Sequence, residues 1–268
     1  MSLENKGLSI NYEIVKSMMK TENLSKSEVF TKLKLFGYSN FLIKYDDALN
    51  RSVLSDILSS SLSISSLFYM ANLGEKGNYF KVLEIIDFCY YNKIKKIMLL
   101  NNQKGENQKY EEFIFNLKQN LRSVVKYANL YGVEISIENF SYQKPFCSPD
   151  ELLDILKGVK DLKIVFDTAN CYLAGQDVVS AFDKLYPYIS NIHLKDVIES
   201  SMDDYDVLNV QNKPYNYCPL SSGKAFVDEV FKKSRELNFK GEYYLEGNNL
   251  REMEKVLSES SLYYFSNL

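Results

Sequence analysis

Hydrophobic and polar positions divide this chain into two alternating kinds of segment. Short runs rich in Val, Ile, Leu, Phe and Tyr predict β-strands. These runs are residues 7–11, 40–44, 62–68, 95–101, 133–139, 162–167, 189–195 and 242–247. Between them, apolar residues recur with the period of an α-helix. The predicted helices are 25–37, 110–132, 148–158, 222–238 and 250–265, with weaker patterns at 49–59, 77–92 and 177–187.

Residues that start and end helices support several of these boundaries. Ser148 stands at the N-cap of segment 148–158, Pro149 follows at the first helical position, and Gly158 ends the segment. The helical prediction therefore rests on end signals as well as on periodicity.

The alternation of strand and helix predicts an α/β fold with parallel strands, because each strand is followed by a helical crossover. Eight such units suggest a closed (β/α)8 TIM barrel, which commonly uses about 250 residues as one domain. We therefore expect a single domain over residues 1–268. An open doubly wound sheet is the alternative, but no G-x-G-x-x-G loop follows the first predicted strand, which counts against its dinucleotide-binding form.

Composition excludes several classes of protein. The formal net charge is −3, whereas nucleic-acid-binding proteins usually carry a basic excess. No run approaches the ~18 apolar residues of a membrane span, and the start of the chain lacks a secretory signal. The four cysteines show no C-x-x-C spacing and predict free thiols in a reducing compartment. We expect a cytoplasmic protein with a small-molecule partner and no nucleic acid or membrane; its oligomeric state stays open.

Four chemically active residues lie at the ends of the last four predicted strands: Glu138, Asp167, His193 and Glu246. Active sites of such barrels lie at these strand ends, and side-chain alternation points all four residues into the barrel. Carboxylates placed together repel one another and resist ionisation. One divalent metal ion resolves this, and oxygen ligands with one imidazole suit Mn, Mg, Co or Zn. A single histidine on a strand is commonly a core residue, but the shared position of all four favours a metal site.

Further polar residues lie close to these strand ends. Lys195 has the same orientation as His193 and is predicted either to bind a substrate hydroxyl, carboxylate or phosphate or to neutralise the carboxylates. Asn139 and Asn170 are predicted to bind substrate hydroxyls. At the opposite end of the strands, Glu134 and Lys163, together with Glu242, predict a neutralised polar plug.

Several segments resemble the xylose isomerase-like TIM barrels, particularly the sugar phosphate isomerase/epimerase group. The matching segments are GVEISIENF (132–140), LKIVFDTANCYLAGQD (162–177), ISNIHLKDV (189–197), GEYYLEGN (241–248) and the helical region 218–246. The resemblance is specific in the C-terminal half. It implies that Glu138, Asp167, His193 and Glu246 bind a divalent metal.

The chain also departs from this family. Many relatives have D-x-x-H after the sixth strand, whereas this chain has Asp167 followed by Asn170 in the last position. The acid that often ends the second strand is absent; that segment offers Leu42, Lys44 or Asp46. A single histidine cannot build the three-zinc cluster of the DNA-repair endonucleases in this superfamily.

The resemblance and the predicted site suggest a metal-dependent isomerase or epimerase that acts on a keto-sugar or polyol. Proton removal next to a carbonyl, through an enediolate, needs a base and a second acid, and Glu138 with Glu246 are the predicted catalytic pair. The alternatives are a keto-inositol dehydratase-type lyase that uses the same site and a non-catalytic sugar-binding barrel.

Two loop features bear on the substrate. The turn 221–224, which opens the seventh predicted helix, is suited to phosphate, but nearby acidic residues favour an unphosphorylated substrate. The long connection 196–221 is predicted to cover part of the pocket.

Overall fold

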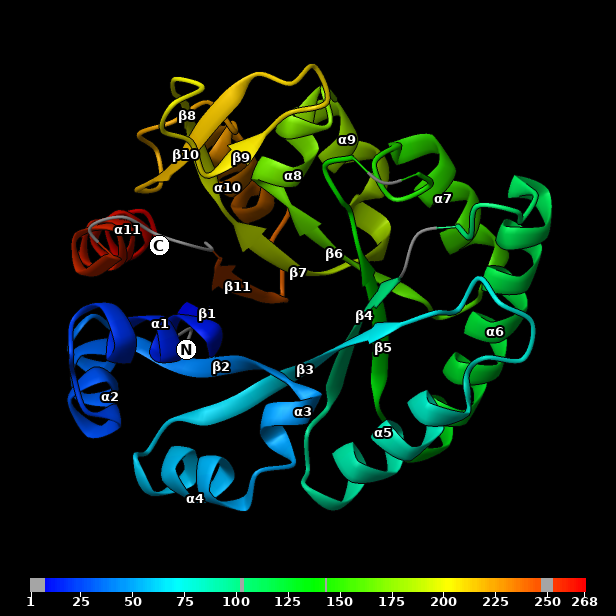
Figure 1. The fold of residues 1–268 in the computed structure, drawn as a ribbon, viewed down its shortest axis with the longest axis horizontal. Helices are drawn as coiled ribbons and strands as arrows, with labels where there is room; N and C mark the ends of the chain where they lie inside the picture. The colour runs from blue at the N-terminus through cyan, green and yellow to red at the C-terminus, as the bar shows by residue number, and fades with distance from the viewer. Residues whose placement is uncertain (1–7, 102–103, 143, 247–252) are drawn as a thin grey trace.

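Parallel strands close into a barrel in the computed structural model of the chain, which describes residues 8–101, 104–142, 144–246 and 253–268 (Figure 1). The strands are β1 (Leu8–Asn11), β2 (Tyr38–Lys44), β3 (Ser63–Ala71), β4 (Lys96–Asn101), β5 (Glu134–Glu138), β6 (Lys163–Asp167), β7 (Ile189–Leu194) and β11 (Glu242–Leu245). Their order around the ring is β1-β11-β7-β6-β5-β4-β3-β2. The predicted (β/α)8 barrel is confirmed, because β11 pairs with β1 and closes the ring that an open sheet would leave unpaired.

Helices surround the barrel on its outside (Figure 1). They are α1 (Glu13–Thr21), α2 (Lys26–Leu35), α3 (Tyr45–Ala48), α4 (Arg51–Ser59), α5 (Phe80–Tyr91), α6 (Tyr110–Tyr131), α7 (Pro149–Gly158), α8 (Thr168–Leu173), α9 (Val178–Leu185), α10 (Val227–Glu236), α11 (Met253–Ser266) and the 3-10 turn η1 (Tyr186–Tyr188). Each predicted helix is present, and α1, α3 and α8 are additional. In α7, Ser148 accepts a hydrogen bond from the backbone N–H of Glu151, as its capping signal predicts. The start of the last predicted helix, 250–252, lies outside the described residues.

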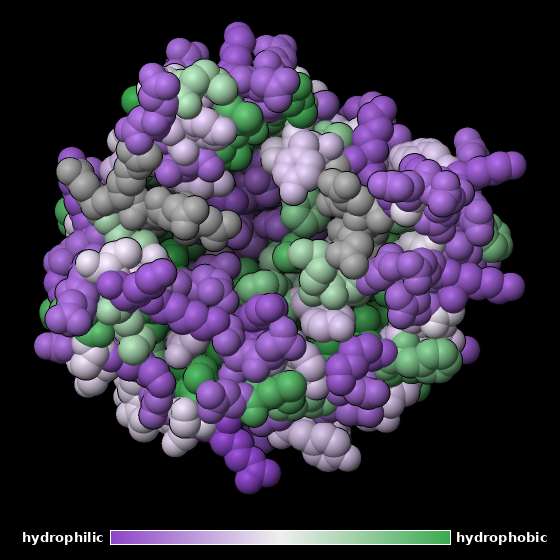
Figure 2. Space-filling model, viewed as in Figure 1, coloured by the Kyte–Doolittle hydropathy of each residue, from purple (hydrophilic) through white to green (hydrophobic). Residues whose placement is uncertain are grey.

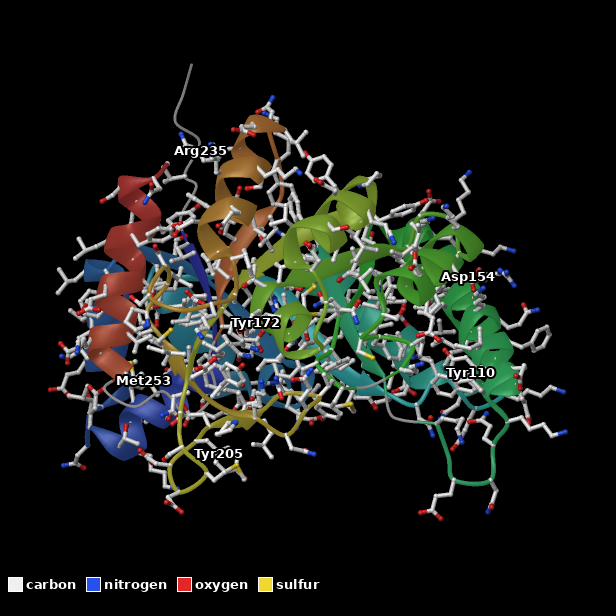
Figure 3. The ribbon with its side chains drawn as sticks, turned by 90° about the horizontal axis from the view of Figure 1, so that it is seen from above. Tyr110, Asp154, Tyr172, Tyr205, Arg235 and Met253 are labelled. Atoms are coloured by element: carbon white, nitrogen blue, oxygen red, sulfur yellow. The ribbon has the colours of Figure 1, made fainter. Side chains whose placement is uncertain are left out.

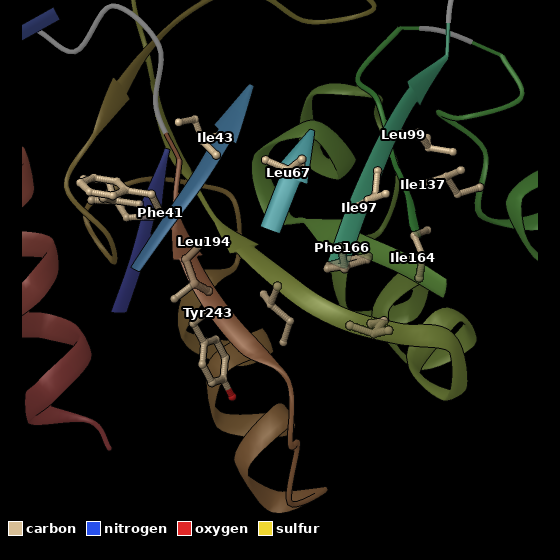
Figure 4. Packing of buried hydrophobic residues seen from close by; sticks show 14 of the residues in the cluster. Phe41, Ile43, Leu67, Ile97, Leu99, Ile137, Ile164, Phe166, Leu194 and Tyr243 are labelled. Atoms are coloured by element: carbon tan, nitrogen blue, oxygen red, sulfur yellow. The ribbon is translucent and has the colours of Figure 1, made fainter. Parts of the chain in front are cut away.

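The two faces of the strands build two separate cores. Outward-facing residues such as Ile137, Phe166 and Leu194 pack against the helices in one continuous cluster (Figure 4). Inward-facing Leu42, Met98, Val165 and Tyr244 form a second, small cluster inside the barrel. Tyr244 and Val165 belong to the parity predicted to face inward, so the alternation read from the sequence holds at these strands.

Polar groups fill the N-terminal end of the barrel, as predicted, but the cation that balances Glu242 is a different lysine. The Nζ of Lys96 donates a hydrogen bond to Oδ1 of Asn191 at 2.7 Å and lies 3.6 Å from Oε2 of Glu242. The hydroxyl of Tyr244 donates to the same Glu242 oxygen. The plug therefore takes its positive charge from Lys96 on β4, whereas the sequence predicts Lys163 on β6 for this role.

The long connection after β7 is folded as a second sheet, in contrast to the loop that its sequence predicts. Strands β8 (Asp196–Glu199), β9 (Val207–Leu208) and β10 (Pro214–Cys218) pair antiparallel in the order β8-β10-β9. Figure 3 shows Tyr205 of this segment on the same side of the molecule as the helix starts Tyr110 and Met253, and Arg235 near the end of α10 on the other side. The small sheet therefore lies at the end of the barrel where the helices begin.

Helix α10 begins at Val227, five residues later than predicted from Ser222. The cause is Asp196, whose buried carboxylate accepts hydrogen bonds from the backbone N–H groups of Gly223 and Ala225, both at 2.9 Å. These bonds wrap residues 223–225 around the carboxylate, and Phe226 adopts the left-handed conformation (φ 55°) before the helix starts.

Two expectations from composition can be compared with the structure. Within the described ranges, no helix combines the length and the hydropathy needed to cross a membrane. The four cysteines are all free thiols. The predicted cytoplasmic location stays a prediction.

Candidate metal centre

Four side chains converge at the C-terminal ends of neighbouring barrel strands. Glu138 ends β5, Asp167 ends β6, His193 is the next-to-last residue of β7, and Glu246 follows β11 directly. One ligand atom from each residue lies within 4.8 Å of the others. Glu138, Asp167 and His193 are buried, and Glu246 is nearly so. Figure 2 looks onto this end of the barrel and shows hydrophilic residues gathered in a central hollow.

The contacts around His193 bring three candidate ligand atoms close together. Its Nδ1 atom lies 2.7 Å from Oε1 of Glu138 and 2.6 Å from Oε2 of Glu246. All three atoms are buried, and none has a hydrogen-bond partner among the described residues. Buried polar atoms without a partner are costly and rare in native proteins. A divalent cation between them satisfies all three atoms, so the residues present fit the metal that the sequence suggested.

Lys195 balances part of the negative charge of this cluster. Its buried Nζ donates a hydrogen bond to Oδ2 of Asp167 at 3.0 Å and lies 3.8 Å from Oε2 of Glu246. Three carboxylates and one ammonium leave a formal charge of −2 when His193 is neutral. One divalent cation therefore brings the buried site to neutrality, which a low-dielectric interior favours.

Burial and charge shift the pKa values in this cluster in opposite directions. Burial and the charge of Glu246 raise the pKa of Glu138 to about 7. Burial opposes the charged form of His193, but Glu246 and Glu138 outweigh it and raise the pKa of His193 to about 10. Burial also opposes ionisation of Glu246, yet Lys195 and His193 lower its pKa to about 2. Burial outweighs Lys195 at Asp167 and raises its pKa. Opposed shifts of this size in neighbouring groups are typical of functional sites.

The two asparagines predicted to bind substrate hydroxyls contact the protein backbone here. The buried Asn139 side chain donates to the carbonyl oxygen of Asp167 at 2.9 Å and accepts from its N–H at 2.8 Å. Asn170 donates from its amide to the carbonyl oxygen of Asn139 at 3.0 Å, and its N–H bonds Oδ1 of Asp167 at 2.7 Å. Both residues thus hold Asp167 in place, and hydroxyl binding by them stays a prediction.

Two residues beside the site, Thr168 and Tyr217, are absent from the set predicted from the sequence. The Thr168 hydroxyl donates to the carbonyl oxygen of Lys195 at 2.6 Å and accepts from its N–H at 3.1 Å. Thr168 follows a predicted ligand directly, which was the available signal. Tyr217 of β10 places its ring centroid 5.7 Å from Nζ of Lys195. No sequence pattern indicated this contact, because it depends on how the small sheet folds back.

The second barrel strand contributes no acid, as its sequence suggested. Leu42 belongs to the cluster inside the barrel, and Asp46 pairs with Lys44 at 3.1 Å on the surface.

The turn before α10, considered above as a phosphate site, is occupied by the protein itself. Its N–H groups at Gly223 and Ala225 already bind the Asp196 carboxylate. An external anion would have to displace a buried carboxylate to use these donors.

The closed barrel and a buried carboxylate- and histidine-lined cluster whose residues fit a divalent metal together define the class of this protein. The sequence model of the family described as Xylose isomerase-like TIM barrel matches residues 80–264, more than half of the chain. The chain belongs to that family, and the resemblance seen in its sequence is confirmed. Among curated proteins, no sequence matches significantly.

Solved structures share the fold at low identity. A probable 3-DHS dehydratase involved in petrobactin synthesis from Bacillus anthracis has a TM-score of 0.71 at 16% identity, covering 97% of this chain and 98% of that chain. A xylose isomerase-like TIM barrel protein from Mycobacterium smegmatis in complex with magnesium scores 0.72 at 14% identity (100% and 98%). D-psicose 3-epimerase with D-tagatose from Clostridium cellulolyticum H10 scores 0.68 at 12% identity (96% and 97%). These likenesses establish the fold, and the reaction has to be argued from the site.

Proposed function

We propose that this protein is a divalent-metal-dependent isomerase or epimerase of a keto-sugar or polyol. The observation that carries the proposal is the pair of buried glutamate oxygens, Glu138 Oε1 at 2.7 Å and Glu246 Oε2 at 2.6 Å from His193 Nδ1. An epimerase and a magnesium-bound protein among the similar structures support the same class of reaction and cofactor. Glu138, Asp167, His193 and Glu246 would hold the ion, with Mn, Mg, Co and Zn as the candidates.

Glu138 and Glu246 are the proposed acid/base pair. Their strands, β5 and β11, are separated in the ring by β6 and β7, so the two carboxylates approach the centre from different sides. One carboxylate takes the proton from the carbon next to the substrate carbonyl, and the other returns a proton to the enediolate. When bound, the metal supplies Lewis-acid stabilisation of the negative charge that develops on the substrate oxygens.

Lys195 is the proposed substrate-binding cation at this site. Its Nζ has one hydrogen bond to Asp167 and lies close to Glu246, so a remaining N–H can reach a substrate hydroxyl. Asn139 and Asn170 remain weaker proposals, because their amides already bind backbone atoms. The near-neutral site and the occupied turn at Gly223 both favour a neutral, unphosphorylated substrate.

A lyase is the second candidate, and one contact favours it. The Lys195 ammonium lies 3.8 Å from Glu246 Oε2, so it can stabilise the negative charge that this carboxylate acquires when its carboxyl group gives a proton to a departing hydroxyl. A probable dehydratase among the similar structures points the same way.

Turnover assays distinguish these functions from each other and from a non-catalytic barrel. The protein with Mn²⁺ is incubated with a panel of ketoses and keto-inositols, and products are separated by chromatography. An isomeric or epimeric product is expected, and a dehydrated product would replace the isomerase proposal by the lyase. The variant Glu246→Gln should lower the turnover by about 10²–10⁴-fold and retain weakened metal binding. Absence of turnover on every compound would favour the sugar-binding barrel.

A further inference from the structure

The candidate ligands lie where the regular pairing of the barrel strands stops. The paired register of β5 and β6 ends with Glu138 opposite Val165, and that of β6 and β7 ends with Asp167 opposite His193. Glu138 is therefore paired only with β6 and Asp167 only with β7, whereas His193 is paired on both sides, with β6 and with β11. Another source of order is needed to hold ligand atoms from separate strands about one point.

Two side chains continue the pairing beyond that limit. The Asn139 amide carries the same donor and acceptor as a peptide group, and it uses both on the backbone of Asp167, at 2.9 and 2.8 Å. The Thr168 hydroxyl similarly uses a donor and an acceptor on the backbone of Lys195, at 2.6 and 3.1 Å. Both side chains are buried, so water does not compete for these bonds.

We propose that Asn139 and Thr168 are positioning residues of the metal centre, which join the ends of β5, β6 and β7 through side-chain bonds to backbone. The inference rests on the proposed metal-dependent function. Neither residue supplies a ligand atom. Each sets the separation of two backbones that carry Glu138, Asp167 and His193, and metal sites tolerate errors of only about 0.2 Å in ligand distance.

The test compares metal binding in the full-length protein and its variants. Asn139→Ala removes the amide, and Thr168→Val removes the hydroxyl at nearly constant shape. The matched control is Asn120→Ala, because the buried Asn120 amide also donates to two backbone carbonyls, Leu73 at 2.8 Å and Glu75 at 2.6 Å, and none of these residues belongs to the metal centre. Thr168→Ser keeps a hydroxyl at this position, in contrast to Thr168→Val. Co²⁺ and Mn²⁺ are titrated by calorimetry, and the visible spectrum of bound Co²⁺ reports the ligand geometry.

Asn139→Ala and Thr168→Val should weaken Co²⁺ and Mn²⁺ binding by about 10- to 100-fold and change the Co²⁺ spectrum. Asn120→Ala should lower the melting temperature comparably but leave affinity and spectrum unchanged, and Thr168→Ser should recover most of the affinity. Equal metal binding by the Asn139 and Asn120 variants would overturn the inference. If Asn139→Ala does not fold, the Thr168→Val and Thr168→Ser pair decides in the same way. A wild-type protein that binds neither ion would instead overturn the proposed function and the inference that rests on it.

Discussion

Metal binding at this site should release protons in a number that depends on pH. The charges of Glu246 and Glu138 raise the pKa of His193 to about 10, so its imidazole is protonated at neutral pH when no metal competes. A histidine ligand must be neutral, and a carboxylate ligand must be ionised. The pKa of Glu138 is raised to about 7, so this group is ionised at pH 8.5 and protonated at pH 6. The pKa values of His193 and Glu138 are both raised, so protons compete with the metal throughout the range from pH 6 to pH 8.5.

The magnitude follows from these two pKa values. At pH 8.5 binding should release about one proton, from His193, and at pH 6 about two, from His193 and Glu138. Over the same range the apparent association constant should fall by about 3.5 orders of magnitude as the pH falls, because the His193 proton contributes a tenfold change per pH unit throughout and the Glu138 proton contributes about one further tenfold change below pH 7.

Calorimetric titration of chelator-treated protein with Mn²⁺, in buffers of different ionisation enthalpy, measures the proton release. The variant Glu138→Gln should release about one proton at pH 6, because the titrating carboxyl is gone and His193 still carries its proton. A release near zero at pH 8.5 in the wild-type protein would refute the reasoning, because it would show that His193 is already neutral before the metal binds.

Three further predictions concern stability. A chelator should lower the melting temperature measured by calorimetry, since a metal at about a thousand times its dissociation constant contributes about 4 kcal/mol; an unchanged temperature would count against the metal site. Lys195→Met should lower the free energy of unfolding of chelator-treated protein by about 3–5 kcal/mol, measured by urea denaturation. The reason is that Asp167 stays buried but loses the ammonium at 3.0 Å. A loss below about 1 kcal/mol would contradict this role of Lys195. Asp196→Ala should lower the free energy of unfolding by about 2 kcal/mol or more, because the N–H groups of Gly223 and Ala225 lose their acceptor. A variant as stable as the wild-type protein would contradict the role given to Asp196.

The fold and the candidate ligands were predictable because both follow from short-range patterns. Strand and helix alternate in the sequence, and a parallel sheet of eight such units has few ways to close. Residue parity on a strand fixes which face a side chain takes, so Glu138, Asp167, His193 and Glu246 could be assigned to one end and one face without coordinates.

The errors arose where local signals compete with distant contacts. Ser222 is a good N-cap residue, yet α10 starts at Val227 because Asp196, 27 residues before Gly223, takes the backbone donors of the turn. A distant contact also occupies Asn139, whose amide bonds the backbone of Asp167, 28 residues away. Substrate hydroxyl binding by Asn139 stays a prediction.

The sequence by itself determined the barrel, the end of the barrel that carries the chemistry, and the residue types that meet there. Only the tertiary structure decided which groups neutralise, position and cover the residues of the candidate site. Lys96 rather than Lys163 balances Glu242, Thr168 bonds the backbone of Lys195, and Tyr217 returns from β10 to the Lys195 ammonium. The physical reason is register: a periodic pattern gives each side chain its face, but the distance between two segments far apart in the chain depends on how all the strands between them are paired and staggered.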